Sequence, residues 1–184
     1  MCQKLSGKSF VPRVKRAAVA GGAVEGWTPA GNSAAYRQLI SLEPPWGHTF
    51  HLELGTAEEM PARTSRLRVE LECTCTRQHP AEDMLCFLHH SREQLRGNQG
   101  ASLLDTLCTG PYLDVEKTTS WFQILVKAAW VMTQPLPRDC YLTVLPSRRS
   151  CRLRLANASN TQCLLIEMMF GVQHGDSGTF LIVT

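Results

Sequence analysis

A strict alternation of apolar and polar residues in RLRVELECTCT, residues 66–76, sets the first limit on the fold of this chain. Successive side chains of a β-strand point to opposite faces, so this pattern predicts a half-buried strand. The residues on its buried face would be Leu67, Val69, Leu71, Cys73 and Cys75. Phe50, Leu52 and Leu54 alternate in the same way. With the polar residues 56–65 between them, the two runs predict an antiparallel hairpin.

The spacing of the apolar residues changes after residue 79. The stretch PAEDMLCFLHHSREQLRG predicts a helix from Pro80 to Gly97, because proline and acidic residues suit a first turn and glycine suits an end. Its apolar stripe comprises Met84, Leu85, Leu88 and Leu95. A second helix is predicted over residues 114–133, where apolar residues recur at helical spacing until Pro135.

Three further stretches have the character of strands. Residues 35–42 end at a proline-glycine turn, and residues 151–155 alternate between apolar residues and arginine. Residues 163–172 are apolar on both faces, which predicts a central strand. Strands, then helices, then strands again predict an α+β fold with a mixed or antiparallel sheet and flanking helices. The length of 184 residues allows one core, so we expect a loose leader over residues 1–18 and one domain over residues 19–184.

Composition and charge argue against several classes of protein. The chain is 43% hydrophobic and 19% charged, as in ordinary globular domains, and its net charge of +3 is too small to indicate a nucleic-acid binder. No apolar run approaches the ~18 residues that a bilayer crossing requires. The first 16 residues also lack the apolar stretch of a signal peptide.

Eight cysteines without a preceding secretory segment favour a reduced, intracellular state over a disulfide framework. They stand at positions 2, 73, 75, 86, 108, 140, 151 and 163. The sequon Asn157-Ala158-Ser159 would matter only in the secretory lumen. The last residues, GTFLIVT, form an apolar segment without a cap, so we expect a piece of a longer protein and an aggregation-prone isolated chain.

Several stretches between Gly21 and Leu181 together resemble the inositol trisphosphate receptor-interacting protein family, in particular its like-1 branch. These stretches are EGWTP, PPWGHTFHLEL, RLRVELECTCT, EDMLCFLHH, SLLDTLCTGPYLDVEKT, WFQILVKAAW, LTVLPSRRSCRLRL and IEMMFGVQHGDS. The resemblance implies a Mab-21-type fold, similar to the nucleotidyltransferase lobe of cyclic GMP–AMP synthase. It also implies membrane association and a calcium-release receptor as protein partner. Full-length members would have a membrane-anchoring segment and a C-terminal helical lobe, both of which we expect to be missing from this piece. The resemblance implies no cofactor and no established catalytic activity.

Nucleotidyl transfer needs two metal ions held by carboxylates. The family pattern, laid on this chain, puts a glycine-serine turn at Gly21-Gly22 and the acid pair near Asn32 and Ser33. Gly22 lacks a hydroxyl, and the neutral oxygens of Asn32 and Ser33 cannot supply the charge that carboxylates give to magnesium. We therefore expect a degenerate, catalytically silent site.

Glu167 is where the resemblance places the third metal-holding acid. In a strand that is apolar on both faces, its carboxylate must be paired or have its pKa raised by desolvation. Glu167 is thus either a vestigial metal ligand or half of a buried ion pair with an arginine such as Arg152 or Arg154, and we favour the ion pair.

Glu70 and Glu72 have the spacing that puts two carboxylates on one strand face. Arg66 and Arg68 share that face, so we favour a solvated lattice of cross-strand charges over a metal site.

Cys73 and Cys75, with His48 and His51 upstream, raise the possibility of a zinc site. The alternation puts both sulfurs on the apolar face, and C-x-C alone is a weak zinc spacing, so we favour core cysteines and expect no bound metal. The pair His89 and His90 is interpreted as polar surface of the first helix.

The most concentrated basic stretch comprises Arg148, Arg149, Arg152 and Arg154. Such a patch suits an inositol phosphate, a nucleotide or an anionic membrane. The favoured alternative is an edge strand protected by charge.

The tetrapeptide Gly175-Asp176-Ser177-Gly178 is similar to the letters around a serine-protease nucleophile. The motifs that would supply the histidine base and its orienting acid are missing, so we interpret it as a turn.

The sequence therefore predicts a non-catalytic interaction module. Two alternatives stay open. One is a residual metal-dependent enzyme that uses Glu70, Glu72 and Glu167, and the other is an anion sensor that uses the four arginines without turnover.

Overall fold

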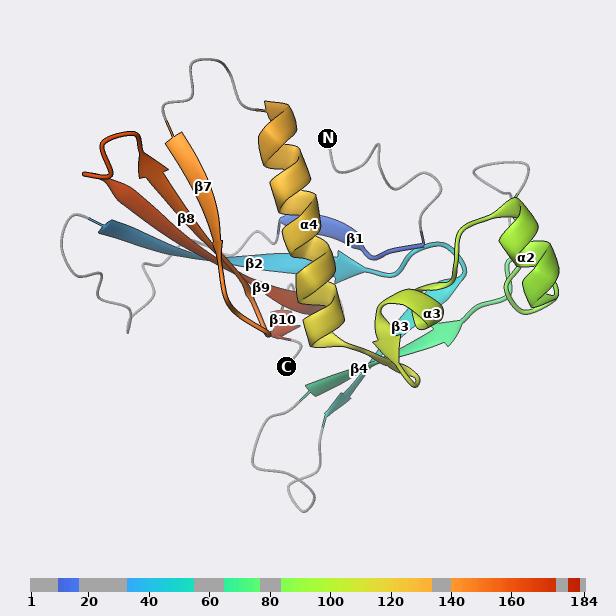
Figure 1. Cartoon of the computed structure of the whole chain (residues 1–184). Helices are drawn as coiled ribbons and strands as arrows, with labels where there is room; N and C mark the ends of the chain where they lie inside the picture. Colours follow the sequence, from blue (N-terminus) through green and yellow to red (C-terminus); the bar gives the residue numbers. More distant parts are fainter. Residues whose placement is uncertain are drawn as a thin grey trace. The chain divides into compact units, whose positions relative to one another are not determined.

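The computed structural model describes residues 10–16, 33–54, 65–76, 84–133, 140–174 and 179–182 (Figure 1). The chain divides into two compact units, each made of separate segments. The first comprises residues 1–15, 42–114 and 172–184, and the second comprises residues 16–41 and 115–171. The expected single domain stays a prediction.

The larger sheet has the strand order β1-β2-β9-β8-β7, and β10 pairs with β9. Its strands are β1 (Arg13–Arg16), β2 (Ser33–Glu43), β7 (Cys140–Leu145), β8 (Cys151–Asn157), β9 (Cys163–His174) and β10 (Thr179–Ile182). Strand β2 is parallel to β9, whereas β8 is antiparallel to both β9 and β7. The sheet is therefore mixed, and the prediction of a central strand over residues 163–172 is confirmed.

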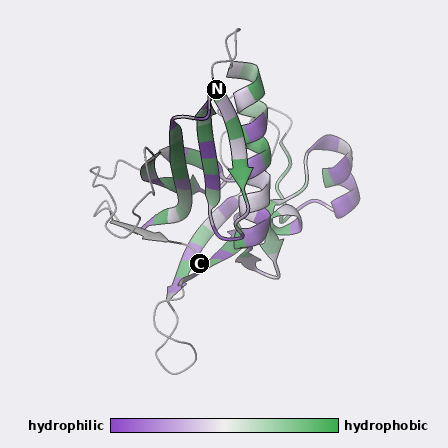
Figure 2. Cartoon of the chain, turned by 60° about the vertical axis from the view of Figure 1, so that its left-hand side comes forward, coloured by the Kyte–Doolittle hydropathy of each residue, from purple (hydrophilic) through white to green (hydrophobic). Residues whose placement is uncertain are grey.

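The predicted second helix is confirmed as α4 (Val115–Thr133), which packs on the second unit's sheet. Phe122 is buried and meets Phe170 of β9 edge-to-face, with ring centroids 5.3 Å apart. Figure 2 shows both hydrophobic and hydrophilic residues along the length of α4. Among the described residues, no helix combines the length and the hydrophobicity that a membrane crossing requires.

The predicted hairpin is confirmed in the first unit, where β3 (His48–Leu54) and β4 (Ser65–Leu71) pair in antiparallel register. The apolar face of β4 is buried at Leu67 and Val69. A second, much shorter hairpin, β5 (Cys108–Thr109) with β6 (Tyr112–Leu113), extends this sheet through β4. A one-turn helix, α3 (Leu103–Thr106), precedes it.

The outer face of the β3–β4 hairpin carries the expected lattice of charges. The Arg68 guanidinium lies 3.2 Å from the Glu70 carboxylate and 3.6 Å from that of Glu53. The His51 Nε2 atom of β3 lies 3.4 Å from the other oxygen of the Glu70 carboxylate. Glu70 thus pairs with Arg68 of its own strand and lies close to His51 of β3, and Glu72 lies beyond the end of the strand.

The predicted first helix is wrong over most of its described length. Residues 84–91 are not helical, and α2 spans only Arg92–Asn98. Ser91 caps the helix: its hydroxyl accepts the Gln94 N–H, while the Gln94 side chain accepts the Ser91 N–H. This capping box fixes the start of the helix at Arg92, twelve residues after the predicted start at Pro80. Residues 80–83 lie outside the described residues.

The expected loose leader is also wrong for its described part, residues 10–16. These residues include β1, which pairs with β2. Phe10 is buried and packs edge-to-face against Phe87, with ring centroids 4.6 Å apart. The segment is therefore part of the packed structure.

Candidate functional site

Glu167, the acid singled out by the resemblance, is buried in the middle of β9. Arg37 Nε donates to one carboxylate oxygen at 3.0 Å. Arg152 Nε and the Ser150 hydroxyl donate to the other at 2.8 and 2.9 Å. Arg37 and Arg152 are the register partners of Glu167 on the strands at either side. The carboxylate therefore forms ion pairs with arginines of both neighbouring strands, β2 and β8.

These donors decide the protonation of Glu167. Burial alone would raise its pKa, but the hydrogen bonds from Arg152, Ser150 and Arg37 outweigh burial and hold the pKa below its ordinary value of 4.5. The favoured interpretation, a buried ion pair with Arg152, is confirmed. Arg154 instead donates to Asn160. Arg37 was missed because the sequence does not reveal that β2 lies beside β9.

Ser33, where the resemblance puts one of the paired acids, opens β2 opposite Cys163, four positions before the Arg37–Glu167 pair. At about 3.3 Å per residue, the two positions are about 13 Å apart along the strands. The two metal ions of a nucleotidyl-transfer site lie only about 3.5–4 Å apart. Glu167 is therefore too far from Ser33 to share a metal pair with it. Gly21, Gly22 and Asn32 lie outside the described residues.

The arginine stretch is not on an edge strand, so the favoured interpretation of these charges is wrong. Arg152 and Arg154 lie on β8, which pairs with β7 on one side and β9 on the other. Arg148 lies 3.6 Å from Glu116 on the surface, and Arg149 is exposed in the same loop. Two of the four guanidinium groups are thus already engaged by Glu167 and Asn160.

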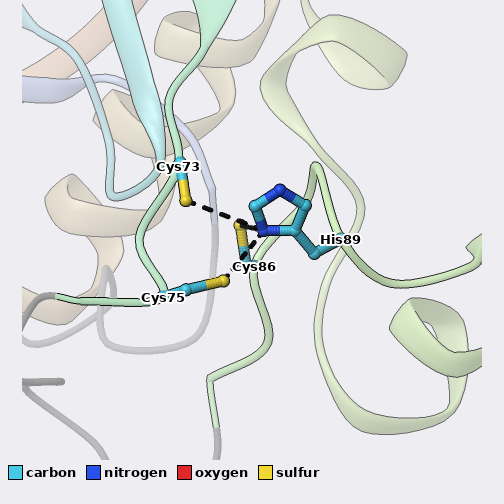
Figure 3. Close-up of side chains that lie close together, drawn as sticks. All are labelled: Cys73, Cys75, Cys86 and His89. Atoms are coloured by element: carbon cyan, nitrogen blue, oxygen red, sulfur yellow. Dashed lines mark hydrogen bonds between the residues drawn. The ribbon is translucent and has the colours of Figure 1, made fainter.

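Four side chains of the first unit converge on one point: Cys73, Cys75, Cys86 and His89 (Figure 3). Their potential ligand atoms all lie within 4.8 Å of one another. We call this group the cysteine–histidine cluster. Cys73 and Cys75 are exposed, so the expectation that they are core cysteines is wrong. His89 is exposed, in agreement with its interpretation as polar surface, but it lies in a turn and not in a helix.

The backbone explains why the alternation failed at Cys73. Strand β4 ends at Leu71: the Glu72 N–H still donates to the carbonyl of Gly47, the residue before β3, but residues 72–74 lie outside the strand. Thr74, between the two cysteines, is the buried residue instead. The chain thus turns its two sulfurs away from the core.

The other half of the cluster is a tight turn over Cys86–Phe87–Leu88–His89. The His89 N–H donates to the Cys86 carbonyl at 3.3 Å, which brings the two side chains to one side. The Thr74 N–H donates to the Cys86 sulfur at 3.5 Å and joins the two halves. The sequence signal was a C-x-C and a C-x-x-H ten residues apart, whose halves were not considered together.

Distances within the cluster centre on His89 Nδ1. The sulfurs of Cys75, Cys73 and Cys86 lie 2.9, 3.6 and 3.7 Å from that nitrogen. Burial would raise the pKa of Cys86, but N–H groups of Thr74 and Leu88 outweigh it and lower the pKa to about 6. Lost hydration of the sulfur, then hydrogen bonds with Cys86 and Cys73, raise the pKa of Cys75 to about 11.

The histidines suspected as zinc ligands lie elsewhere. His48 is buried: its Nδ1–H donates to the Trp46 carbonyl at 2.8 Å, while Nε2 lies 2.8 Å from the Ser102 hydroxyl and accepts the Leu103 N–H. Burial lowers the pKa of His48, which keeps the ring neutral. His51 is on the charged outer face of the hairpin.

The sequon is part of neither site. Asn157 of the sequon belongs to the tight turn between β8 and β9, where its side-chain amide donates to Thr161 and accepts the Gln162 N–H. The tetrapeptide at residues 175–178 lies outside the described residues.

No protein-family model matches the chain. It is 31% identical over 182 residues to inositol 1,4,5-trisphosphate receptor-interacting protein-like 1 of Rattus norvegicus, a match that covers 98% of the chain and 33% of the relative. The Mus musculus protein of the same name matches to the same extent. The chain belongs to the inositol 1,4,5-trisphosphate receptor-interacting protein family.

A second branch of the family matches over a shorter stretch. The inositol 1,4,5-trisphosphate receptor-interacting protein of Bos taurus is 37% identical over 104 residues, which is 50% of the chain and 18% of that protein. The chain spans about a third of the length of its like-1 relatives.

Proposed function

We propose that the chain is part of a non-catalytic, nucleotidyltransferase-like module of the Mab-21 type that binds a protein. The partner we propose is the inositol 1,4,5-trisphosphate receptor, after the names of the relatives. The module would thereby influence calcium release at a membrane. The engagement of Glu167 by two guanidinium groups and the Ser150 hydroxyl is the observation that carries the non-catalytic part.

A carboxylate offers about four lone-pair positions, and three donors already occupy positions on Glu167. A magnesium ion would have to displace these donors and sit beside the positive charges of Arg37 and Arg152. That repulsion, together with the neutral oxygens of Asn32 and Ser33, opposes a two-metal site.

The second unit also offers apolar surface that suits a protein partner. Ile124 and Val131 are 67% and 69% exposed, and their spacing of seven residues puts them on the same face of α4. Large exposed apolar side chains that gather on one face are typical of protein interfaces.

Titration calorimetry with ATP or GTP and magnesium tests the non-catalytic part. We expect no heat that depends on the metal, for the chain as it stands and for Glu167→Gln alike. Magnesium-dependent nucleotide binding that Glu167→Gln abolishes would establish the residual enzyme instead.

Pull-down with the solubilised receptor tests the partner. We expect retention of the receptor by the chain and at least about a tenfold loss of affinity in the double variant Ile124→Ser, Val131→Ser, because a tenfold change requires only about 1.4 kcal/mol. Tyr141→Ser, an exposed side chain of β7, is the matched control and should bind normally. Equal binding by all three chains would refute the role of α4, and no retention at all would refute the partner.

An anion sensor is the second candidate, and the arrangement of the arginines disfavours it. Arg152 and Arg154 are held by Glu167 and Asn160, so a polyanion would have to break those contacts. Polyanion binding without magnesium that is lost in Arg152→Ala, Arg154→Ala would favour the sensor.

A further inference from the structure

We infer that the cysteine–histidine cluster, formed by Cys73, Cys75, Cys86 and His89, binds one zinc ion. The ion would be held by three thiolates and by Nδ1 of the imidazole. This metal site is independent of the receptor-binding role proposed above, since it uses none of the residues of α4 or the larger sheet.

The spacing of the ligand atoms fits a tetrahedral zinc site. Zinc lies about 2.3 Å from sulfur and about 2.0–2.1 Å from nitrogen, so a tetrahedral site separates a sulfur from a nitrogen by about 3.6 Å. Cys73 and Cys86 are at 3.6 and 3.7 Å from His89 Nδ1. Cys75, at 2.9 Å, needs an outward shift of about 0.7 Å to make room for the ion.

The ligand types select the metal. Thiolates with one imidazole favour zinc, whereas magnesium and calcium require oxygen ligands, and tetragonal copper(II) favours nitrogen and oxygen. Four protein ligands also close the coordination sphere and leave no position for a substrate or a reactive water. The site is therefore structural and unrelated to the magnesium chemistry of nucleotidyl transfer.

The surroundings of the cluster match those of a structural zinc site. Backbone N–H groups of Thr74 and Leu88 point at the Cys86 sulfur, a contact that stabilises a ligating thiolate. Phe87, between two ligands, is fixed by Phe10 and by His48, whose ring centroid lies 5.1 Å away. The turn that presents Cys86 and His89 is thus held in place from both sides.

Zinc would give the non-helical segment at residues 84–91 a structural anchor. Its backbone belongs to neither sheet nor helix, and the Gln99 side chain binds both the N–H and the carbonyl of Leu85. Coordination by Cys86 and His89 on one side and by Cys73 and Cys75 on the other would tie this segment to the end of β4. Such a tie converts metal-binding free energy into folding free energy.

Metal content of the whole chain, expressed in zinc-supplemented medium and purified under reducing conditions without chelator, tests the site. Mass spectrometry of the metal should find about one zinc ion per chain. The zinc content of the variants Cys75→Ser and His89→Ala should fall to about a tenth of that value, because three ligands leave the coordination sphere open. His89→Cys should keep a full ion, and so should the control Cys140→Ser, which removes an exposed thiol of β7.

Cobalt(II) gives a second measurement on the unsubstituted chain, in case the variants fold poorly. Tetrahedral thiolate coordination should produce visible ligand-field bands and a near-ultraviolet sulfur-to-cobalt band. That band should strengthen by about a third in His89→Cys, where four thiolates replace three. Zinc should displace the cobalt and abolish both bands.

Three outcomes would overturn the assignment. They are a zinc content near zero together with no cobalt bands, an unchanged zinc content in both Cys75→Ser and His89→Ala, and a disulfide among the three cysteines in the purified reduced chain. Protection of three thiols from alkylation that a chelator removes would instead support it.

Discussion

Gly47 shows how one residue shapes the surroundings of the cluster. Its φ of +73° lies in the left-handed region, and a Cβ there would lie 3.3 Å from Phe87 Cδ2 and 3.7 Å from Thr74 Cγ2. Its carbonyl also accepts the N–H of Glu72 where β4 ends. Glycine is thus needed for the turn, for the close approach of Phe87 and for the exit of the chain toward Cys73.

Gly47→Ala should lower the free energy of unfolding by about 1–2 kcal/mol, the cost of a left-handed conformation for a residue with a Cβ. Chemical denaturation measures the change. Gly97→Ala is the matched control: this glycine lies in α2, has no atoms within 4 Å of its Cβ position, and should gain about 0.5–1 kcal/mol. Equal effects at the two positions would contradict the explanation.

Glu167 is the residue whose protonation links stability to pH. Its pKa in the folded chain is below its ordinary value of 4.5, so the ion pairs stabilise the fold above that pH, and this stabilisation is lost as the pH falls through the folded pKa. Glu167→Gln should cost about 2 kcal/mol at pH 7, because it leaves Arg37 and Arg152 without a counter-charge at a partly solvated position.

Denaturation curves at pH 7 and at pH values below about 4 measure this effect. The gap between the unsubstituted chain and Glu167→Gln should shrink as the pH falls, because protonation makes the two side chains alike. A gap that does not change with pH would show that Glu167 contributes by packing alone.

At the scale of the elements, α4 combines good packing with one buried polar defect. Thr119 is 1% exposed, and its hydroxyl has no hydrogen-bond partner in the described part of the chain. An unpartnered buried hydroxyl destabilises a fold by about 1–3 kcal/mol, whereas an apolar group of the same shape does not.

Thr119→Val should therefore raise the free energy of unfolding by about 0.5–2 kcal/mol, with the thermal midpoint as the readout. Thr119→Ser keeps the hydroxyl and removes the methyl group, so it should lower stability by about 1 kcal/mol. A loss of stability in the valine variant would show that the hydroxyl has a partner in the folded chain.

The elements that periodicity predicted well are the long ones. The hairpin β3–β4 and the helix α4 each repeat their apolar spacing often enough to exclude the alternatives, and the central strand β9 is a long run that is apolar on both faces. The two-residue strands β5 and β6 and the four-residue α3 are too short to show a period. The first helix was predicted to begin too early. The Ser91 capping box and the Cys86–His89 turn do not alter the spacing of the apolar residues, which was the basis of that prediction.

At the scale of the whole molecule, the two compact units lead to a prediction about the metal. The cysteine–histidine cluster belongs to the first unit, while α4 with strands β7 and β8 belongs to the second. Most contacts of each unit lie within that unit. Removal of the metal should therefore destabilise the first unit more than the second.

Amide hydrogen exchange with and without a strong zinc chelator measures this effect. Residues 73–76 and 84–91 should exchange at least about tenfold faster after chelation, because coordination closes their local opening. Residues 115–133 should keep their rates. Uniform acceleration would indicate global unfolding, and no change anywhere would contradict a stabilising metal.

The sequence by itself determined the alternation of the hairpin, the helical spacing of α4, the apolar central strand and the family. Each of these follows from the order of residues along the chain, either through the spacing of apolar residues or through sequence similarity. Only the tertiary structure decided that Arg37 joins Arg152 on Glu167, and that Cys73 and Cys75 meet Cys86 and His89. Such contacts depend on strand order and on where a strand stops pairing, and neither leaves a period in the sequence.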